Sequence, residues 1–245
     1  MLAQFLRDER IIWAPRITRV DCLGVIEVDR EVSSDEIVAV WLRREFEGNW
    51  EKCCKPLNMT KAELQKIVES VDYHNHHDNT IRYLALLCFR YPLLASMLIA
   101  EWQEKTLSLD DFKGLRAIKA FGWDILSRFS GRVSIVAESV YDESEAYISF
   151  FKYQQSIDPN NRLLWNDCVG MVRAIAGIEQ GLTYNKLDGN VILLKSDDSR
   201  FTTILEGNKT AVAFYIKCLL KNVIAYRPFK TYIGHLPKSC QWQWV

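Results

Sequence analysis

The sequence has no apolar run long enough to cross a membrane and no excess of charge of either sign. Its longest apolar run covers only residues 91–100, whereas a membrane-spanning helix needs about 20 apolar residues. Lysine plus arginine and aspartate plus glutamate number 31 each, so the formal net charge is zero. A balanced charge removes the electrostatic reason to expect general binding to nucleic acid. We therefore expect no membrane partner, and nucleic acid is not indicated.

Signals for secretion and for disulfide bonds are also missing. The first ten residues carry charged side chains too early for a secretory signal peptide. The seven cysteines are odd in number and irregularly spaced, and none form a C-x-x-C pair. We interpret them as reduced thiols and expect a cytoplasmic protein.

Several well-known catalytic and binding motifs are absent as well. The sequence contains no G-x-S-x-G nucleophile elbow, no dinucleotide-binding glycine fingerprint and no calcium-binding loop. Residues 207–210, Gly-Asn-Lys-Thr, are similar to the end of the P-loop motif, but the lysine does not directly follow the glycine. The P-loop assignment is therefore rejected.

The residues that are present predict a protein of the α/β (α+β) class. Ser33-x-x-Glu36 and Thr60-x-x-Glu63 are capping boxes, which mark helix starts. We predict a mainly helical region over residues 1–135, followed by a small mixed-sheet α/β domain over residues 136–245. Within the first region we predict a strand over 22–29 and helices over 80–104 and 110–129, and at the boundary a short strand over 132–137.

The C-terminal half alternates helix and strand patterns. The apolar spacing predicts a helix over 163–180 that ends near Gly181. Apolar and β-branched runs predict strands over 191–194 and 201–205, paired as a hairpin. A helix follows the second strand, and two further strands are predicted over 222–226 and 230–233.

The joint between strand 201–205 and the next helix is the best candidate for chemistry. Gly207 permits a tightly folded backbone there, and Asn208 is a good helix N-cap. The free N–H groups of a helix start attract anions, and Lys209 and Thr210 add a charge and a hydroxyl. We predict a phosphate-binding site at Gly207, Asn208, Lys209 and Thr210. An ordinary strand–turn–helix joint without a ligand remains the alternative.

This order of elements, with residues 205–213 reading Leu-Glu-Gly-Asn-Lys-Thr-Ala-Val-Ala, resembles the ParB/sulfiredoxin-like fold. Members of that family carry an acid, a glycine and one or two basic residues at such a turn. The resemblance covers about residues 140–236 and implies a turn that holds nucleotide phosphates on its backbone. It also implies activities such as CTP hydrolysis, phosphoryl transfer or nuclease action, although some members only bind. Lys209 offers a point charge where the family has arginine, which would offer a bidentate fork.

Three further residues are candidates for the same site. Glu206 is a candidate catalytic residue that would bind a metal with the phosphate, or it would only cap the helix. His235 is a candidate general base, because an unperturbed histidine titrates near neutrality. Arg173 lies in the preceding helix and is a candidate phosphate ligand, although a solvated arginine is the alternative. No metal ligand is assigned, and the cofactor is unknown, with Mg²⁺ accompanying a nucleotide as the candidate.

Two other functions stay open, and whether the chain is an enzyme is uncertain. The first is a non-catalytic adaptor that holds a protein partner through the helical half and the aromatic tail, residues 241–245. The second is a metal-dependent hydrolase or nuclease centred on His74, His76, His77 and Asp78, since imidazole and carboxylate ligate divalent ions.

Overall fold

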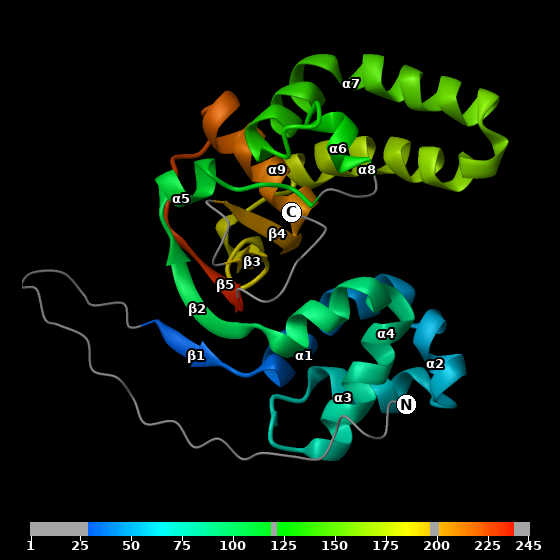
Figure 1. Cartoon of the computed structure of the whole chain (residues 1–245), viewed down its shortest axis with the longest axis vertical. Helices are drawn as coiled ribbons and strands as arrows, with labels where there is room; N and C mark the ends of the chain where they lie inside the picture. The colour runs from blue at the N-terminus through cyan, green and yellow to red at the C-terminus, as the bar shows by residue number, and fades with distance from the viewer. Residues whose placement is uncertain (1–28, 119–121, 197–200, 238–245) are drawn as a thin grey trace, which may run out of the picture.

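The computed structural model describes residues 29–118, 122–196 and 201–237, and it has a mixed α/β architecture (Figure 1). The strands are β1 (Arg30–Val32), β2 (Glu101–Leu107), β3 (Ile192–Ser196), β4 (Thr202–Glu206) and β5 (Phe229–Leu236). The α-helices are α1 (Ser34–Asn49), α2 (Glu51–Leu57), α3 (Lys61–Glu69), α4 (His76–Ile99), α5 (Leu109–Lys113), α6 (Trp123–Leu126), α7 (Val133–Ile157), α8 (Arg162–Gln180) and α9 (Asn208–Tyr215). Two 3₁₀ turns, η2 (Pro159–Asn161) and η3 (Tyr184–Lys186), and the π-helix η4 (Ile216–Leu220) complete the described elements.

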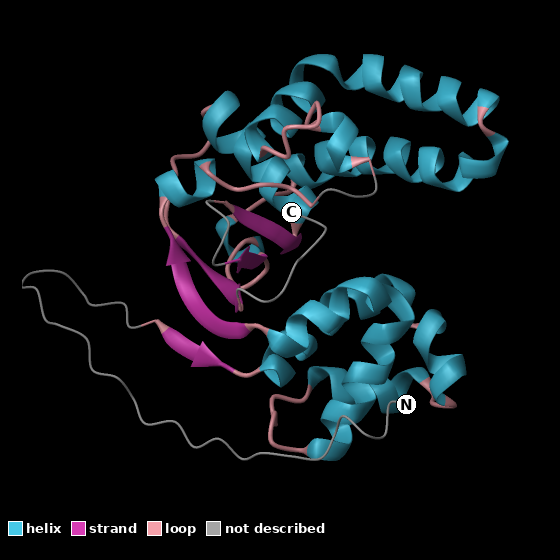
Figure 2. Cartoon of the chain, in the orientation of Figure 1, coloured by secondary structure: helices cyan, strands magenta, loops and turns pink. Residues whose placement is uncertain are grey.

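A five-stranded sheet in the order β1-β2-β5-β3-β4 lies between two groups of helices (Figure 2). Strand β2 is antiparallel to β1 and β5, whereas β3 is parallel to β5 and antiparallel to β4. Helices α1–α4 gather on one side of the sheet and α7–α9 on the other (Figure 1). This arrangement confirms the predicted class, a helical N-terminal region with a mixed sheet. Because β1 and β2 join the same sheet as β3–β5, both halves of the chain contribute strands, and a domain boundary at residue 135 stays a prediction.

The helix predicted over residues 80–104 is wrong at its C-terminal end. Helix α4 ends at Ile99, and Glu101–Leu107 is strand β2. Along β2 the side chains of Trp102 and Leu107 are buried while that of Lys105 is exposed. The strand forms because its whole length pairs with β5, a contact that local helix propensity does not report.

Two other predicted elements are wrong for similar reasons. The helix over 110–129 is replaced by the short helices α5 and α6, and residues 115–118 between them run beside β4. Arg116 N–H donates to Thr202 O at 2.9 Å, and Ile204 N–H donates to Arg116 O at 2.8 Å. The strand predicted over 132–137 is instead the start of α7. Residues 222–226 are not a strand, and Asn222 adopts a left-handed conformation there, with φ +52°.

The helix and strand predictions on either side of the candidate joint are confirmed. Helix α8 occupies the predicted span, β3 and β4 pair as a hairpin, and α9 follows β4. Residues 22–28 and 241–245, a predicted strand and the aromatic tail, lie outside the described residues. Of the helices in the described part, none combines the length and the apolar character needed to span a membrane.

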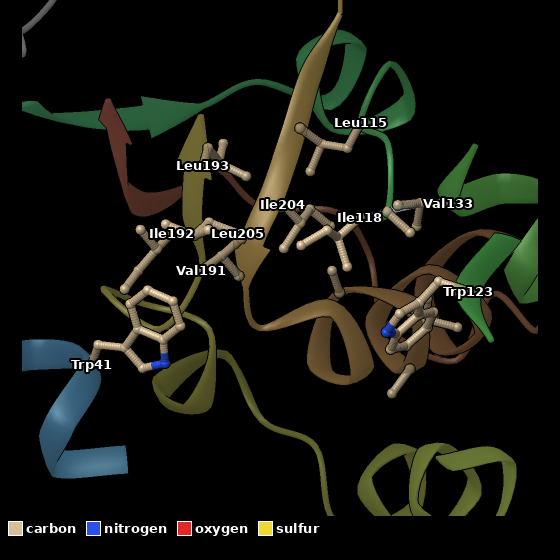
Figure 3. Close-up of a cluster of buried hydrophobic side chains, with 14 of the residues drawn as sticks. Trp41, Leu115, Ile118, Trp123, Val133, Val191, Ile192, Leu193, Ile204 and Leu205 are labelled. Carbon is tan, nitrogen blue, oxygen red and sulfur yellow. The ribbon is translucent and has the colours of Figure 1, made fainter. Parts of the chain in front are cut away.

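Apolar side chains pack on both faces of the sheet (Figure 3). Trp41 of α1 lies against Ile192 of β3 on one face. On the other face Leu115, Ile118 and Val133 surround Ile204 of β4. The core therefore fixes α1, the 115–118 segment and the start of α7 relative to β4, and β4 leads directly into the candidate joint.

Gly234 gives a test of this packing. It faces Trp102 in the β2–β5 register, and a Cβ atom at Gly234 would lie 2.8 Å from the indole ring and 2.9 Å from Leu194 Cδ2. We expect Gly234→Ala to lower the free energy of unfolding by about 1–3 kcal/mol, the usual cost of overpacking. Urea unfolding measures the change. The control is Gly170→Ala on an exposed face of α8, where no atom lies within 4 Å, and this variant should stabilise the protein by up to about 1 kcal/mol. Equal effects in the two variants would contradict the packing.

Candidate functional site

The candidate site is the joint at which β4 ends and α9 begins. Gly207 has φ +92° and occupies the N-cap position of α9. A Cβ atom there would lie 2.7 Å from Asn190 O and 3.2 Å from Val191 Cα. Glycine is therefore required at this position for two reasons. The backbone is left-handed there, and the residues just before β3 leave no room for a side chain.

Asn208 does not cap the helix, as its type had suggested. Because Gly207 takes the N-cap position, Asn208 becomes the first helical residue and its side chain turns inward. Its Nδ2 donates to Ile204 O at 3.2 Å, and its Oδ1 accepts from Ile118 N–H at 3.4 Å. The side chain of Asn208 thus holds the 115–118 segment to the end of β4 and is not available to a phosphate.

The start of α9, like the starts of α7 and α8, has no side-chain cap, in contrast to the starts of α1, α3 and α4. Side chains of Ser33, Thr60 and Asn75 accept hydrogen bonds from the first turns of α1, α3 and α4. No side chain caps the start of α9, and no acidic residue lies in its first turn. The positive end of this helix is therefore not neutralised by its own residues.

The other predicted phosphate ligands differ in exposure and in the helix that carries them. Lys209 is exposed in the first turn of α9, and Thr210 is half-buried beside it. In the described part of the chain Lys209 makes no ion pair. Arg173 is exposed on α8, a helix that packs against α9.

Arg44 of α1 is the residue at this joint that sequence reasoning missed. Its Nη1 donates to Asn190 O and lies 3.8 Å from Glu206 Oε1. The same nitrogen is 3.4 Å from the position of a Gly207 Cβ. Arg44 stands beside Glu45 in the sequence, and such mixed charges are typical of a solvated surface. Its spacing of three residues from the buried Trp41 was the available signal, since positions i and i+3 share one helix face.

His235 lies away from the joint, near the other end of the sheet. It pairs with Lys195 in the β3–β5 register, whereas Glu206 pairs with Ile192, which pairs with Tyr232. This register separates Glu206 and His235 by about 10 Å along the strand direction, at about 3.3 Å per residue. His235 instead lines a groove of about 390 Å³ with Lys105, Lys195 and Thr202. The structure therefore does not bring the two predicted catalytic residues onto one reacting atom.

Residues 74–78, which hold the histidine cluster, lead into helix α4. Asn75 caps α4, because its Oδ1 accepts from His77 N–H at 3.1 Å and from Asp78 N–H at 3.2 Å. Across the described ranges, no group of three His, Cys, Asp and Glu residues is arranged to hold a metal ion. At the joint, Glu206 is the one acid within residues 206–211. A single carboxylate suits Mg²⁺ that arrives with a nucleotide, since Mg²⁺ takes most of its other ligands from phosphates and water.

Comparison with protein-family models, curated proteins and solved structures found no match for this chain. The joint must therefore be judged on its own geometry. It combines an uncapped helix N-terminus, a guanidinium held by Asn190 O and an exposed ammonium. Such a set can bind an oxyanion.

Proposed function

We propose that this chain is a cytoplasmic, ParB-like protein that binds a nucleotide or another phosphate-bearing small molecule at the start of α9. The single observation that carries the proposal is the position of Arg44. The ParB-like motif has arginine after its glycine, where this chain has Asn208 and Lys209. Arg44 brings a guanidinium from α1 to the same turn, and a guanidinium supplies the bidentate fork that lysine lacks.

The charges of Arg44 and Glu206 indicate whether binding of a phosphate depends on Mg²⁺. A guanidinium has five N–H donors, so the bond to Asn190 leaves others for a phosphate. Glu206 lies 3.8 Å from Arg44 Nη1, and a bound phosphate would place negative charge near this carboxylate. A divalent cation shared by the two relieves that repulsion. We therefore expect tighter binding with Mg²⁺ than without it.

We propose binding of the ligand at this joint ahead of its chemical conversion. A phosphohydrolase or phosphotransferase needs a general base within hydrogen-bond reach of the attacking group. The register places His235 about 10 Å from Glu206 along the strands. Turnover would need another base, and Glu206 is the nearest acid to Arg44 with a described contact.

The adaptor alternative is favoured by one observation. Helices α7 and α8 form an arm that projects from the body of the protein (Figure 1). Large apolar side chains are exposed near its far end, namely Phe150, Tyr153, Ile157 and Leu163. A protein partner would cover such a surface, and in that case nucleotides would leave the thermal midpoint unchanged.

A thermal-shift screen with ATP, CTP, GTP, UTP and inorganic phosphate, each with and without Mg²⁺, tests the proposal. Native-state binding raises the midpoint by mass action. Lys209→Ala and Arg44→Gln should each reduce the shift. Losing a charge-assisted hydrogen bond costs about 1.5–3 kcal/mol, so we expect Arg44→Gln to weaken binding by about 10- to 150-fold.

Arg162→Gln, at the exposed start of α8, is the control and should shift like the wild type. Far-ultraviolet circular dichroism checks that Arg44→Gln is folded, because that change also removes the bond to Asn190 O. Equal shifts in all variants, or no shift with any ligand, would refute binding at this joint.

A further inference from the structure

Arg116 and Arg132 lie directly opposite each other on adjacent backbone segments. The two residues form an isolated antiparallel bridge. Its flanking hydrogen bonds run from Ala117 N–H to Gly131 O at 2.7 Å and from Val133 N–H to Leu115 O at 3.2 Å. The arginines therefore occupy a non-hydrogen-bonded pair, the type in which facing side chains approach most closely. Like charges placed this way repel each other and destabilise the fold.

No acidic side chain compensates this repulsion in the part of the chain that the structure describes. Neither arginine takes part in a described ion pair. Arg116 Nε is buried and has no acceptor among the described residues. Its guanidinium lies over the ring of Phe201, 3.3 Å from the ring centre. Burial, and after it the charge of Arg132, lowers the pKa of Arg116.

The start of α7 adds a third source of positive charge. Arg132 is the N-cap residue of α7, where a small polar or acidic side chain is usual. No side chain caps this helix, and its first turn holds no acid. The positive end of the α7 dipole therefore points toward two arginines, an arrangement that is unfavourable without an anion. Figure 3 shows the neighbouring Leu115 and Val133 packed around Ile204, so the core holds both segments in place.

We propose that Arg116, Arg132 and the start of α7 form a second anion site, which binds the phosphate group of a small molecule. Two guanidinium groups suit a phosphate because each can donate two parallel hydrogen bonds to its oxygens. The site is separate from the α9 joint. Arg116 bridges Thr203, which precedes Glu206 by three residues on β4, or about 10 Å of strand. The inference therefore does not depend on the function proposed above.

The test is isothermal titration of the full chain with inorganic phosphate at constant ionic strength. Arg132→Gln should weaken binding at this site at least tenfold, whereas Arg162→Gln, an exposed arginine at the start of α8, should leave it unchanged. Arg44→Gln and Lys209→Ala, which alter the α9 joint, should also retain this binding. Because the α9 joint is also proposed to take phosphate, the Arg132→Gln comparison is made in the Lys209→Ala protein. Phosphate binding that survives Arg132→Gln in that protein, or an absence of phosphate binding in Lys209→Ala itself, would overturn the second site.

Thermal unfolding without phosphate gives an independent readout with a distinctive sign. Because Arg132→Gln removes a like-charge contact, it should raise the midpoint in phosphate-free buffer and reduce the rise that phosphate produces. A lowered midpoint in phosphate-free buffer would show that Arg132 has a structural role and would overturn the proposal.

A second variant tests recognition by two arginines, and a second ligand tests the source of the phosphate. Arg132→Lys keeps the charge but loses the fork, so its affinity for phosphate should fall between those of the wild type and Arg132→Gln. An affinity of Arg132→Lys no better than that of Arg132→Gln would count against two-arginine recognition. Glycerol 3-phosphate distinguishes the source of the phosphate. Tighter binding than inorganic phosphate indicates a phosphomonoester as the ligand, and weaker binding indicates free phosphate.

Discussion

Replacing Arg82 with leucine is expected to lower the free energy of unfolding by about 3–5 kcal/mol, the cost of removing one member of a buried charged network. The Arg82 side chain of α4 is fully buried. Its guanidinium donates to Ile67 O at 3.1 and 2.9 Å, to Ser70 O at 2.7 Å, to Asp72 O at 3.2 Å and to Asn79 Oδ1 at 2.6 Å. Leucine would remove all five of these bonds, although Ser70 O would keep a donor in Arg43 Nη2 at 3.2 Å.

Urea unfolding of Arg82→Leu measures this loss, with Arg173→Leu as the matched control. Arg173 is exposed on α8, and its replacement should change the free energy of unfolding by no more than about 0.5 kcal/mol. Similar values for the two variants would mean that the buried network does not hold the segment between α3 and α4.

Gly207→Val is expected to destabilise the protein by about 2–5 kcal/mol, the sum of a left-handed backbone penalty of about 1–2 and an overpacking cost of about 1–3. The valine Cβ would lie 2.7 Å from Asn190 O. This oxygen belongs to the backbone just before β3, so it cannot rotate away as a side chain could. Chemical unfolding measures the effect.

The control for Gly207→Val is Gly181→Ala at the end of α8. Gly181 has φ −93°, and its nearest neighbour to a new Cβ is the flexible end of Lys186 at 3.7 Å. Its replacement should be close to neutral. A Gly207→Val protein as stable as the wild type would show that the joint is not held as described. Because Gly207→Val perturbs the fold, Lys209→Ala is the cleaner probe of ligand binding.

Elements marked by local signals could be predicted from the sequence. Ser33 and Thr60 were identified as helix caps, and both accept the expected backbone hydrogen bonds. The β3–β4 hairpin and the turn at Gly207 were predicted for the same reason, since alternation and a glycine requirement are visible within a few residues. Strand β2 was not predicted, because its stability comes from pairing with β5, more than a hundred residues away in the sequence.

The candidate site shows the same division between local and distant contacts. The backbone turn at Gly207 is a local feature and was predicted. Arg44 and the Arg116–Arg132 pair were not, since each arises only when distant segments meet. His235 was predicted as a partner of Glu206. The strand register that separates them cannot be predicted from the residues next to either one in the sequence.

The most direct test of the central proposal is a ¹H–¹⁵N correlation experiment on the full chain, titrated with CTP and Mg²⁺. We predict that the backbone amide signals of Gly207, Lys209 and Thr210 shift as the ligand binds, because their N–H groups lie at the uncapped start of α9. When Arg44 is replaced by glutamine, the same shifts should need a ligand concentration about 10- to 150-fold higher. Saturating shifts confined to other regions, or none at any concentration, would contradict a phosphate site at this joint.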